Sequence, residues 1–117
     1  MKVKLNFPES DELDNITSLT PGRVYEVLGI EADDYRIQND DGEPYLYPPV
    51  FFTIVDAHKP EDWVVEVGED GETYAYPPEL NAPGFFEDYF DDDPDATLIF
   101  RRYLQKRQAI RHALVER

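Results

Sequence analysis

Few residues of this 117-residue sequence have the type and spacing that catalysis or metal binding requires. The two histidines, His58 and His112, form no His-x-x-x-His pair, so we expect both to face solvent. The two serines, Ser10 and Ser18, lie in a polar segment with no histidine nearby in the sequence. Gly-x-Gly-x-x-Gly, Walker-type and Gly-x-Ser-x-Gly motifs are all absent. We therefore predict that the protein is not an enzyme and uses no cofactor.

A run of aspartates at 91–95 resembles a metal-binding loop only in composition. It lacks the alternating spacing and the distal glutamate of a calcium loop, so we predict no metal site. Asp93 followed by Pro94 is instead a typical helix start, with an N-cap acid and a proline at the first helical position. The run is better explained by helix capping and by solubility.

The charges divide the chain into an acidic body and a basic tail. Residues 1–97 contain 25 acids and five bases, a net charge of −20, whereas residues 98–117 contain six bases and one acid, a net charge of +5. An acidic body repels phosphate, so we expect no direct nucleic-acid partner. An acidic body attracts basic proteins and speeds their association. The simplest alternative is that the acids only keep a small protein soluble.

Composition also predicts the compartment. The sequence has no cysteine and hence no disulfide framework. Its first residues contain no apolar run typical of a secretory signal, and no stretch approaches the roughly 18 apolar residues of a membrane span. We expect a protein of the reducing cytoplasm that does not bind membranes.

Apolar residues alternate or cluster over several short segments typical of β-strands. The polar segment ESDELDNITSL, residues 9–19, follows the first expected strand and is expected to form a loop or one short helix, before a turn at Thr20-Pro21-Gly22. An apolar run at 50–55 predicts a strand buried on both faces. The expected strand segments lie at 3–7, 23–30, 35–38, 43–49, 50–55, 63–67 and 72–78.

Two hairpins carry a repeated phrase, GEPYLYPP at 42–49 and GETYAYPP at 71–78. An Asp-Gly pair before each phrase predicts a tight turn, since glycine supplies the positive φ that the turn needs. A two-residue turn would pair Ile37 with Leu46 and direct Tyr45 and Tyr47 outward, beside Arg36.

The same turn in the second hairpin would direct Tyr74 and Tyr76 onto the apolar face. A three-residue turn with a bulge would reverse both assignments. In either case we expect one tyrosine pair inside and the other outside, and we favour the first pair as the exposed one.

The remainder of the chain changes character after Pro78. We predict an acidic, aromatic loop over 79–93 and a C-terminal helix over 94–117. One helical face would carry Ile99 and Tyr103 inward, together with Ala96, Ile110, Ala113 and Leu114. The whole chain is expected to form a single domain, 1–117, with a β body over 1–78. Whether the basic helix docks on that body is left open.

The segment LTPGRVYEVLGIEADDYRIQNDDGEPYLYPPVFFTIVD, residues 19–56, resembles small Src-homology-3-like barrel domains of uncharacterised bacterial and phage proteins. The resemblance covers about a third of the chain. It implies a small β-barrel and a binding role rather than a catalytic one. The second hairpin and the C-terminal helix depart from a minimal barrel, so the expected fold is mainly β (α+β), a small barrel of five to seven short strands with a C-terminal α-helix. Small acidic bacterial proteins of this appearance are often immunity proteins that block a toxin.

Together these features predict a non-catalytic, acidic protein-binding module. The expected partner is a basic protein such as a cognate toxin, which the chain would inhibit by occlusion. Two alternatives are a peptide-binding module of the same barrel and an acidic mimic of nucleic acid. The predicted partner-binding residues are Tyr45, Tyr47, Arg36, Asp33, Asp34, Asp40, Asp41 and Glu43.

Overall fold

The computed structural model describes residues 1–6 and 18–115, with side chains described as far as residue 109. Most of the polar segment predicted as a loop or short helix therefore lies outside the described residues. The chain divides into two compact units, Met1–Pro77 and Pro78–Arg117. The boundary lies next to residue 78, where the sequence predicts the end of the β body.

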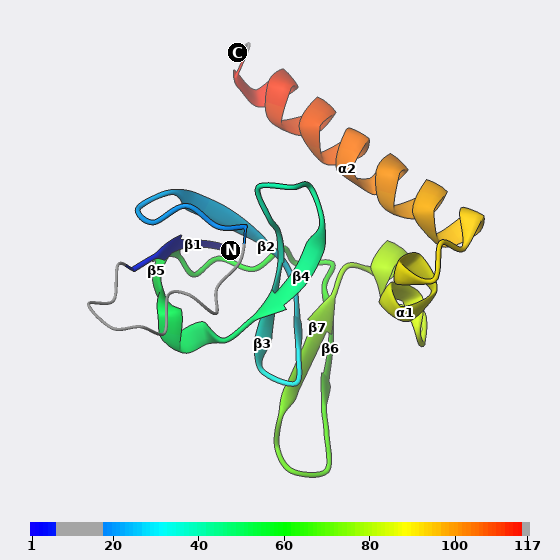
Figure 1. Ribbon diagram of the computed structural model, residues 1–117, viewed down its shortest axis with the longest axis horizontal. Helices are drawn as coiled ribbons and strands as arrows, with labels where there is room; N and C mark the ends of the chain where they lie inside the picture. The colour runs from blue at the N-terminus through cyan, green and yellow to red at the C-terminus, as the bar shows by residue number, and fades with distance from the viewer. Residues whose placement is uncertain (7–17, 116–117) are drawn as a thin grey trace. The chain divides into compact units, whose positions relative to one another are not determined.

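The first unit is an open antiparallel sheet, and the mainly β prediction is confirmed (Figure 1). Five strands follow one another in the order β4-β3-β2-β1-β5, and the hairpin β6–β7 attaches to β2 through β7. Over the described residues the ends of this sheet do not pair to close a barrel. The strands are β1 (Lys2–Leu5), β2 (Val24–Glu31), β3 (Asp34–Gln38), β4 (Pro44–Tyr47), β5 (Phe52–Asp56), β6 (Val64–Val67) and β7 (Thr73–Tyr76).

Alternation of apolar and polar residues positions the core, because successive side chains of a strand point to opposite faces. In β1 the side chains of Val3 and Leu5 are buried while Lys2 and Lys4 are exposed. The prediction that the 50–55 run is buried on both faces is wrong. In β5 only Phe52 is buried, since β5 is an edge strand that pairs with β1 alone. A short 3₁₀ helix, η2 (Pro49–Phe51), begins that run instead.

Both Asp-Gly hairpins have the three-residue turn with a bulge, so the register based on a two-residue turn is wrong. The N–H of Gly42 donates to the Asn39 carbonyl (2.9 Å), and that of Gly71 donates to the Gly68 carbonyl (3.1 Å). The two glycines have φ of 81° and 80°, whereas the aspartate before each is not in the left-handed region. This combination is a type I turn followed by a glycine bulge.

The register that results splits each tyrosine pair. Tyr47 lies opposite Tyr35 and is 5% exposed, whereas Tyr45 lies opposite Ile37 and is 42% exposed. Leu46 lies opposite Arg36, not opposite Ile37 as predicted. In the second hairpin Tyr76 is buried and Tyr74 half-buried, so the expectation of one pair inside and one outside is wrong. In each copy the tyrosine nearer the turn is the more exposed one.

The second unit contains the helices. It begins with a short 3₁₀ helix, η3 (Pro78–Leu80), and continues with α1 (Phe85–Phe90) and α2 (Pro94–Val115). The segment predicted as an acidic aromatic loop therefore contains a short helix. The predicted start of the C-terminal helix is confirmed: the Asp93 carboxylate accepts a hydrogen bond from the N–H of Ala96 (3.0 Å), and Pro94 follows it. No helix in the described ranges has the length and apolar character that a membrane span requires.

Aromatic packing decides which face of α2 is buried. The ring of Phe100 contacts Phe86 and Tyr89 of α1, with ring centroids 6.0 and 5.1 Å apart. Phe100 and Tyr103 are buried, whereas Ile99, which was predicted to face inward, is exposed. The predicted inward positions of Ala96 and Tyr103 are thus confirmed, and Phe100 takes the place predicted for Ile99. The predicted inward side chains at 110, 113 and 114 lie outside the described ones.

The register predicts a measurable difference between the two tyrosines of β4. Tyr47→Ala should lower the free energy of unfolding by about 3–5 kcal/mol, because it removes a buried aromatic ring. Tyr45→Ala should cost less than about 1 kcal/mol, since much of that side chain is already exposed. Chemical denaturation of both variants tests this assignment, and equal losses of stability would contradict the register.

Candidate functional site

The structure separates the predicted acidic residues into two groups. Asp33 and Asp34 lie where β2 turns into β3, whereas Asp40, Asp41 and Glu43 lie in the turn from β3 to β4. These turns are at opposite ends of β3. The predicted partner-binding residues therefore do not form one continuous patch.

Asp40 ties its turn to the chain segment before β2. Its carboxylate accepts hydrogen bonds from the Thr20 hydroxyl (2.7 Å), the Tyr25 hydroxyl (2.8 Å) and the Arg23 guanidinium (2.8 Å). The Asp40 N–H also donates to the Ser18 carbonyl (2.8 Å). Asp40 thus has a structural role that the sequence did not indicate.

These contacts change the acidity of Asp40. Desolvation is the largest contribution and raises the pKa of the carboxyl. The hydrogen bonds from Thr20 and Tyr25 and the charge of Arg23 together outweigh it, so the pKa lies below the ordinary value of 3.8. The ionised form of Asp40 is therefore the form that stabilises the fold.

Asp33 also has internal contacts. Ala32 and Asp33 form the two-residue turn between β2 and β3 with φ of 49° and 70°, a conformation that aspartate tolerates better than alanine. The Asp33 N–H donates to the Thr73 carbonyl (3.0 Å), and the Asp33 carboxylate accepts the Thr73 N–H (2.9 Å). Asp33 therefore helps to attach β7 to the edge of β2.

Arg36 and Tyr47 do not face outward as predicted. Arg36 is 5% exposed and donates from Nε to the Tyr76 hydroxyl (3.0 Å), from Nη2 to Glu31 (3.0 Å) and from Nη1 to the Pro44 carbonyl (2.9 Å). The Tyr76 hydroxyl donates in turn to Glu31 (3.0 Å). Desolvation raises the pKa of Tyr76 far above its ordinary value, so Tyr76 is a neutral hydrogen-bonding group in this cluster.

A glycine makes room for this cluster. Ala75 of β7 pairs with Ile30 of β2, which brings the ring of Tyr76 over Gly29. A Cβ at position 29 would lie 2.1 Å from Cδ1 of Tyr76, so any larger residue would displace the ring. No local pattern in the sequence indicates that Tyr76, Gly29 and Arg36, which belong to three different strands, lie together.

The hairpin β6–β7 combines exposed apolar side chains with a segment that contains acids and no base. Val64, Val65 and Val67 are 37%, 59% and 69% exposed. Residues 61–76 contain no base and carry six acids, namely Glu61, Asp62, Glu66, Glu69, Asp70 and Glu72. We call this surface the acidic valine strand: β6 together with those six acids. Figure 1 shows the hairpin extending beyond the neighbouring strands.

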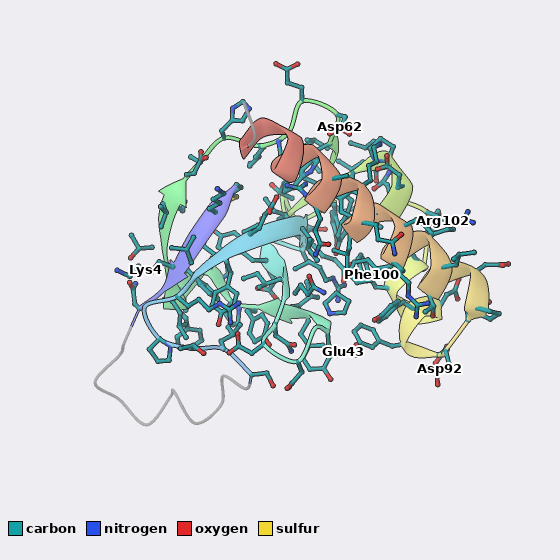
Figure 2. All side chains as sticks on the ribbon, turned by 90° about the horizontal axis from the view of Figure 1, so that it is seen from above. Lys4, Glu43, Asp62, Asp92, Phe100 and Arg102 are labelled. Carbon is teal, nitrogen blue, oxygen red and sulfur yellow. The ribbon has the colours of Figure 1, made fainter. Side chains whose placement is uncertain are left out.

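Sequence reasoning identified β6 as a strand but not as a candidate site. Two features of the sequence could have indicated it. The segment 61–76 contains six acids and no base, and three of the four residues of β6 are valines. Figure 2 shows that Asp62, at the start of this hairpin, lies far from Glu43 in the first hairpin and from Lys4 on β1. The acidic valine strand is therefore separate from the first-hairpin residues of the predicted site, whereas Asp33 of that site contacts Thr73 on the adjoining strand β7.

Comparisons with protein-family models, with curated proteins and with solved structures give no match to this chain. Among the side chains that the structure describes, those of residues 1–6 and 18–109, no three histidines, aspartates or glutamates lie close enough together to hold a metal ion.

The contacts of Asp40 predict a pH-dependent contribution to stability. Because the folded-state pKa lies below the unfolded one, the stabilisation is present above about pH 4 and is lost as the pH falls through the folded-state value. Asp40→Asn should lower the free energy of unfolding by about 1 kcal/mol at neutral pH, and the difference from wild type should shrink toward pH 3. Urea denaturation measures it. The exposed Glu69→Gln serves as the control, and a difference that does not change with pH would contradict this role.

The buried cluster predicts a second stability difference. Tyr76→Phe removes only the hydroxyl that links Arg36 and Glu31, so it should cost about 1–3 kcal/mol. Tyr74→Phe, in the same strand, removes a long 3.4 Å contact with Glu72 and should change stability by less than about 0.5 kcal/mol. Thermal and urea denaturation of the two variants test the cluster, and equal effects would argue against it.

Proposed function

We propose that this chain is a non-catalytic protein-binding module that recognises and neutralises a basic protein, as an inhibitor or an immunity protein does. The observation that carries the proposal is the acidic valine strand. It combines exposed apolar side chains with one sign of charge, which together favour a partner with the opposite charge.

Apolar exposure on β6 supports a contact rather than a purely solubilising surface. A protein that needs charge only for solubility gains nothing from valines at 59% and 69% exposure on one strand. Covering the exposed parts of the three valines would contribute on the order of 2–3 kcal/mol to binding. Interfaces obtain much of their affinity from such patches at their centres.

The surrounding acids support a basic partner and a fast association. Charges of one sign steer an oppositely charged protein, and salt weakens the steering because the Debye length is about 10 Å at 0.1 M. The exposed Tyr45 and the neighbouring Glu43, both predicted as partner-binding residues, are proposed as a second point of contact.

We also propose that the strands β4-β3-β2-β1-β5 form a small Src-homology-3-like barrel. Two features support it. The helix η2 connects the two end strands of this path, β4 and β5. The ring of Phe52 on β5 lies 6.5 Å from that of Tyr47 on β4 and 5.9 Å from that of Tyr35 on β3, so the core joins the two ends of the path.

One observation favours a second function on that body, the docking of a proline-rich or extended peptide. Pro48 and Val50 are exposed around η2, and Val50 is 80% exposed. This function would use the β4–β5 connection and would not require the acids of the second hairpin.

Affinity capture with two matched variants tests the proposed function. The first variant neutralises the second hairpin with Glu61→Gln, Glu66→Gln, Glu69→Gln and Asp70→Asn. The control variant makes the same change of charge in the second unit with Glu87→Gln, Asp88→Asn, Asp91→Asn and Asp92→Asn. Wild type and control should retain a basic protein whose activity they inhibit, and the hairpin variant should associate about tenfold more slowly.

Three results distinguish the alternatives. If the hairpin variant captures the partner as well and as fast as the wild type does, at both low and high salt, recognition of charge by this surface is contradicted. Retention of short proline-rich peptides in place of a folded protein would favour the peptide-binding function. Competition by DNA for the captured partner would favour an acidic mimic of nucleic acid.

A further inference from the structure

Strand β6 has one edge that pairs with no other strand in the described part of the chain. It pairs with β7 on one side only, and β7 pairs with β2 on its other side. An unpaired edge exposes a row of main-chain N–H and C=O groups that can pair with an added strand. The hairpin register determines which of these groups point toward the free edge.

The register places the main-chain groups of Val65 and Val67 on the free edge. In an antiparallel pair, directly opposite residues alternate between those that exchange hydrogen bonds and those that direct them outward. The Gly68 N–H donates to the Glu72 carbonyl (2.8 Å), so Gly68 and Glu72 occupy a hydrogen-bonded position of the ladder. The next such pair is Glu66 with Tyr74. Val65 and Val67 alternate with these residues, so their main-chain N–H and C=O groups point away from β7.

An independent hydrogen bond supports this direction. Thr73 lies opposite Val67, and the Thr73 carbonyl accepts the Asp33 N–H (3.0 Å) from the β2–β3 turn. The main-chain groups of Thr73 thus point away from β6, and those of Val67 must point the opposite way. The free edge of β6 offers an N–H and a C=O from each of two residues, with exposed valine side chains above and below.

This edge lacks the residues that usually prevent strand addition. Lysine and proline are the common protective residues on edge strands, and β6 has neither. Its one charged residue is Glu66, and the other acids of the hairpin lie at its ends. β6 is therefore suited to pairing, and the charge around it determines which strand it accepts.

We propose that β6 binds an extended, basic segment of the partner as an additional strand of the sheet. The inference rests on the proposed function and specifies its binding mode. A second copy of this chain is a poor occupant, because pairing two β6 strands would bring six acids against six acids. A partner strand that alternates apolar residues with lysine or arginine places apolar side chains against the valines on one face and a base beside Glu66 on the other.

Amide hydrogen exchange on the full chain tests the pairing directly. The probe is a capped peptide, Lys-Val-Lys-Val-Lys-Val-Lys, and the control is the same peptide with glutamate in place of lysine. The lysine peptide should slow exchange at the amides of Val65 and Val67 by about tenfold or more. The amides of Val64 and Glu66, already bonded to β7, should change little. Absence of binding, or binding without this alternation, would overturn the inference.

Proline substitution separates strand addition from charge attraction. Val67→Pro removes an outward N–H together with the valine side chain and leaves every acid in place, so the hairpin should keep its fold. Its affinity for the lysine peptide should fall at least tenfold, whereas Val67→Thr should stay within about threefold of wild type. Exchange at the amides of Glu66 and Tyr74 confirms that the hairpin of each variant is intact.

The neutralised-hairpin variant and the Val67 variants together distinguish strand addition from charge recognition. If Val67→Pro binds like wild type while the neutralised hairpin does not, strand addition is wrong and charge recognition stands. If strand addition is correct, both variants lose binding. A dimer of the wild type that Val67→Pro abolishes in sedimentation measurements would show that the occupant is a second copy, and that result would also overturn the inference.

Discussion

A glycine in the left-handed conformation at the end of each long hairpin fixes the arrangement of most of the first unit. Gly42 and Gly71 have nearly the same φ, and each follows an aspartate in a three-residue turn. Because strand side chains alternate, this turn determines which residues of four strands face the core. It also determines which main-chain groups of β6 point outward. The buried ring of Tyr47 and the free amides of Val65 and Val67 follow from the same turn geometry.

The second consequence of this register is a buried polar cluster. Tyr76 reaches over Gly29 and joins Arg36 and Glu31, which removes the one arginine of the predicted site from solvent. A buried guanidinium is costly unless its donors are paired, and here Nε, Nη1 and Nη2 each have a partner. Arg36 thus connects its own strand β3 to β2, β4 and β7, while recognition is proposed for β6.

Charge and pairing capacity complement each other in the proposed function. The acids around β6 would attract a basic protein, and the free edge with its exposed valines would hold an extended segment of that protein. The acids of the first hairpin have a different role, since Asp40 and Asp33 hold turns in place through hydrogen bonds. Acids in similar sequence contexts therefore have different roles: some stabilise turns, and others are proposed to recognise the partner.

The sequence alone determined the mainly β body, the strand positions to within about three residues, the two turns and the start of α2 at Asp93 and Pro94, because these depend on local alternation and capping. It did not determine hairpin register, since an Asp-Gly pair fits both a two-residue and a three-residue turn. Only the tertiary structure brought Tyr76 over Gly29, turned Phe100 rather than Ile99 inward, and left β6 at an edge. Each of these depends on contacts between segments distant in sequence, which local patterns do not record.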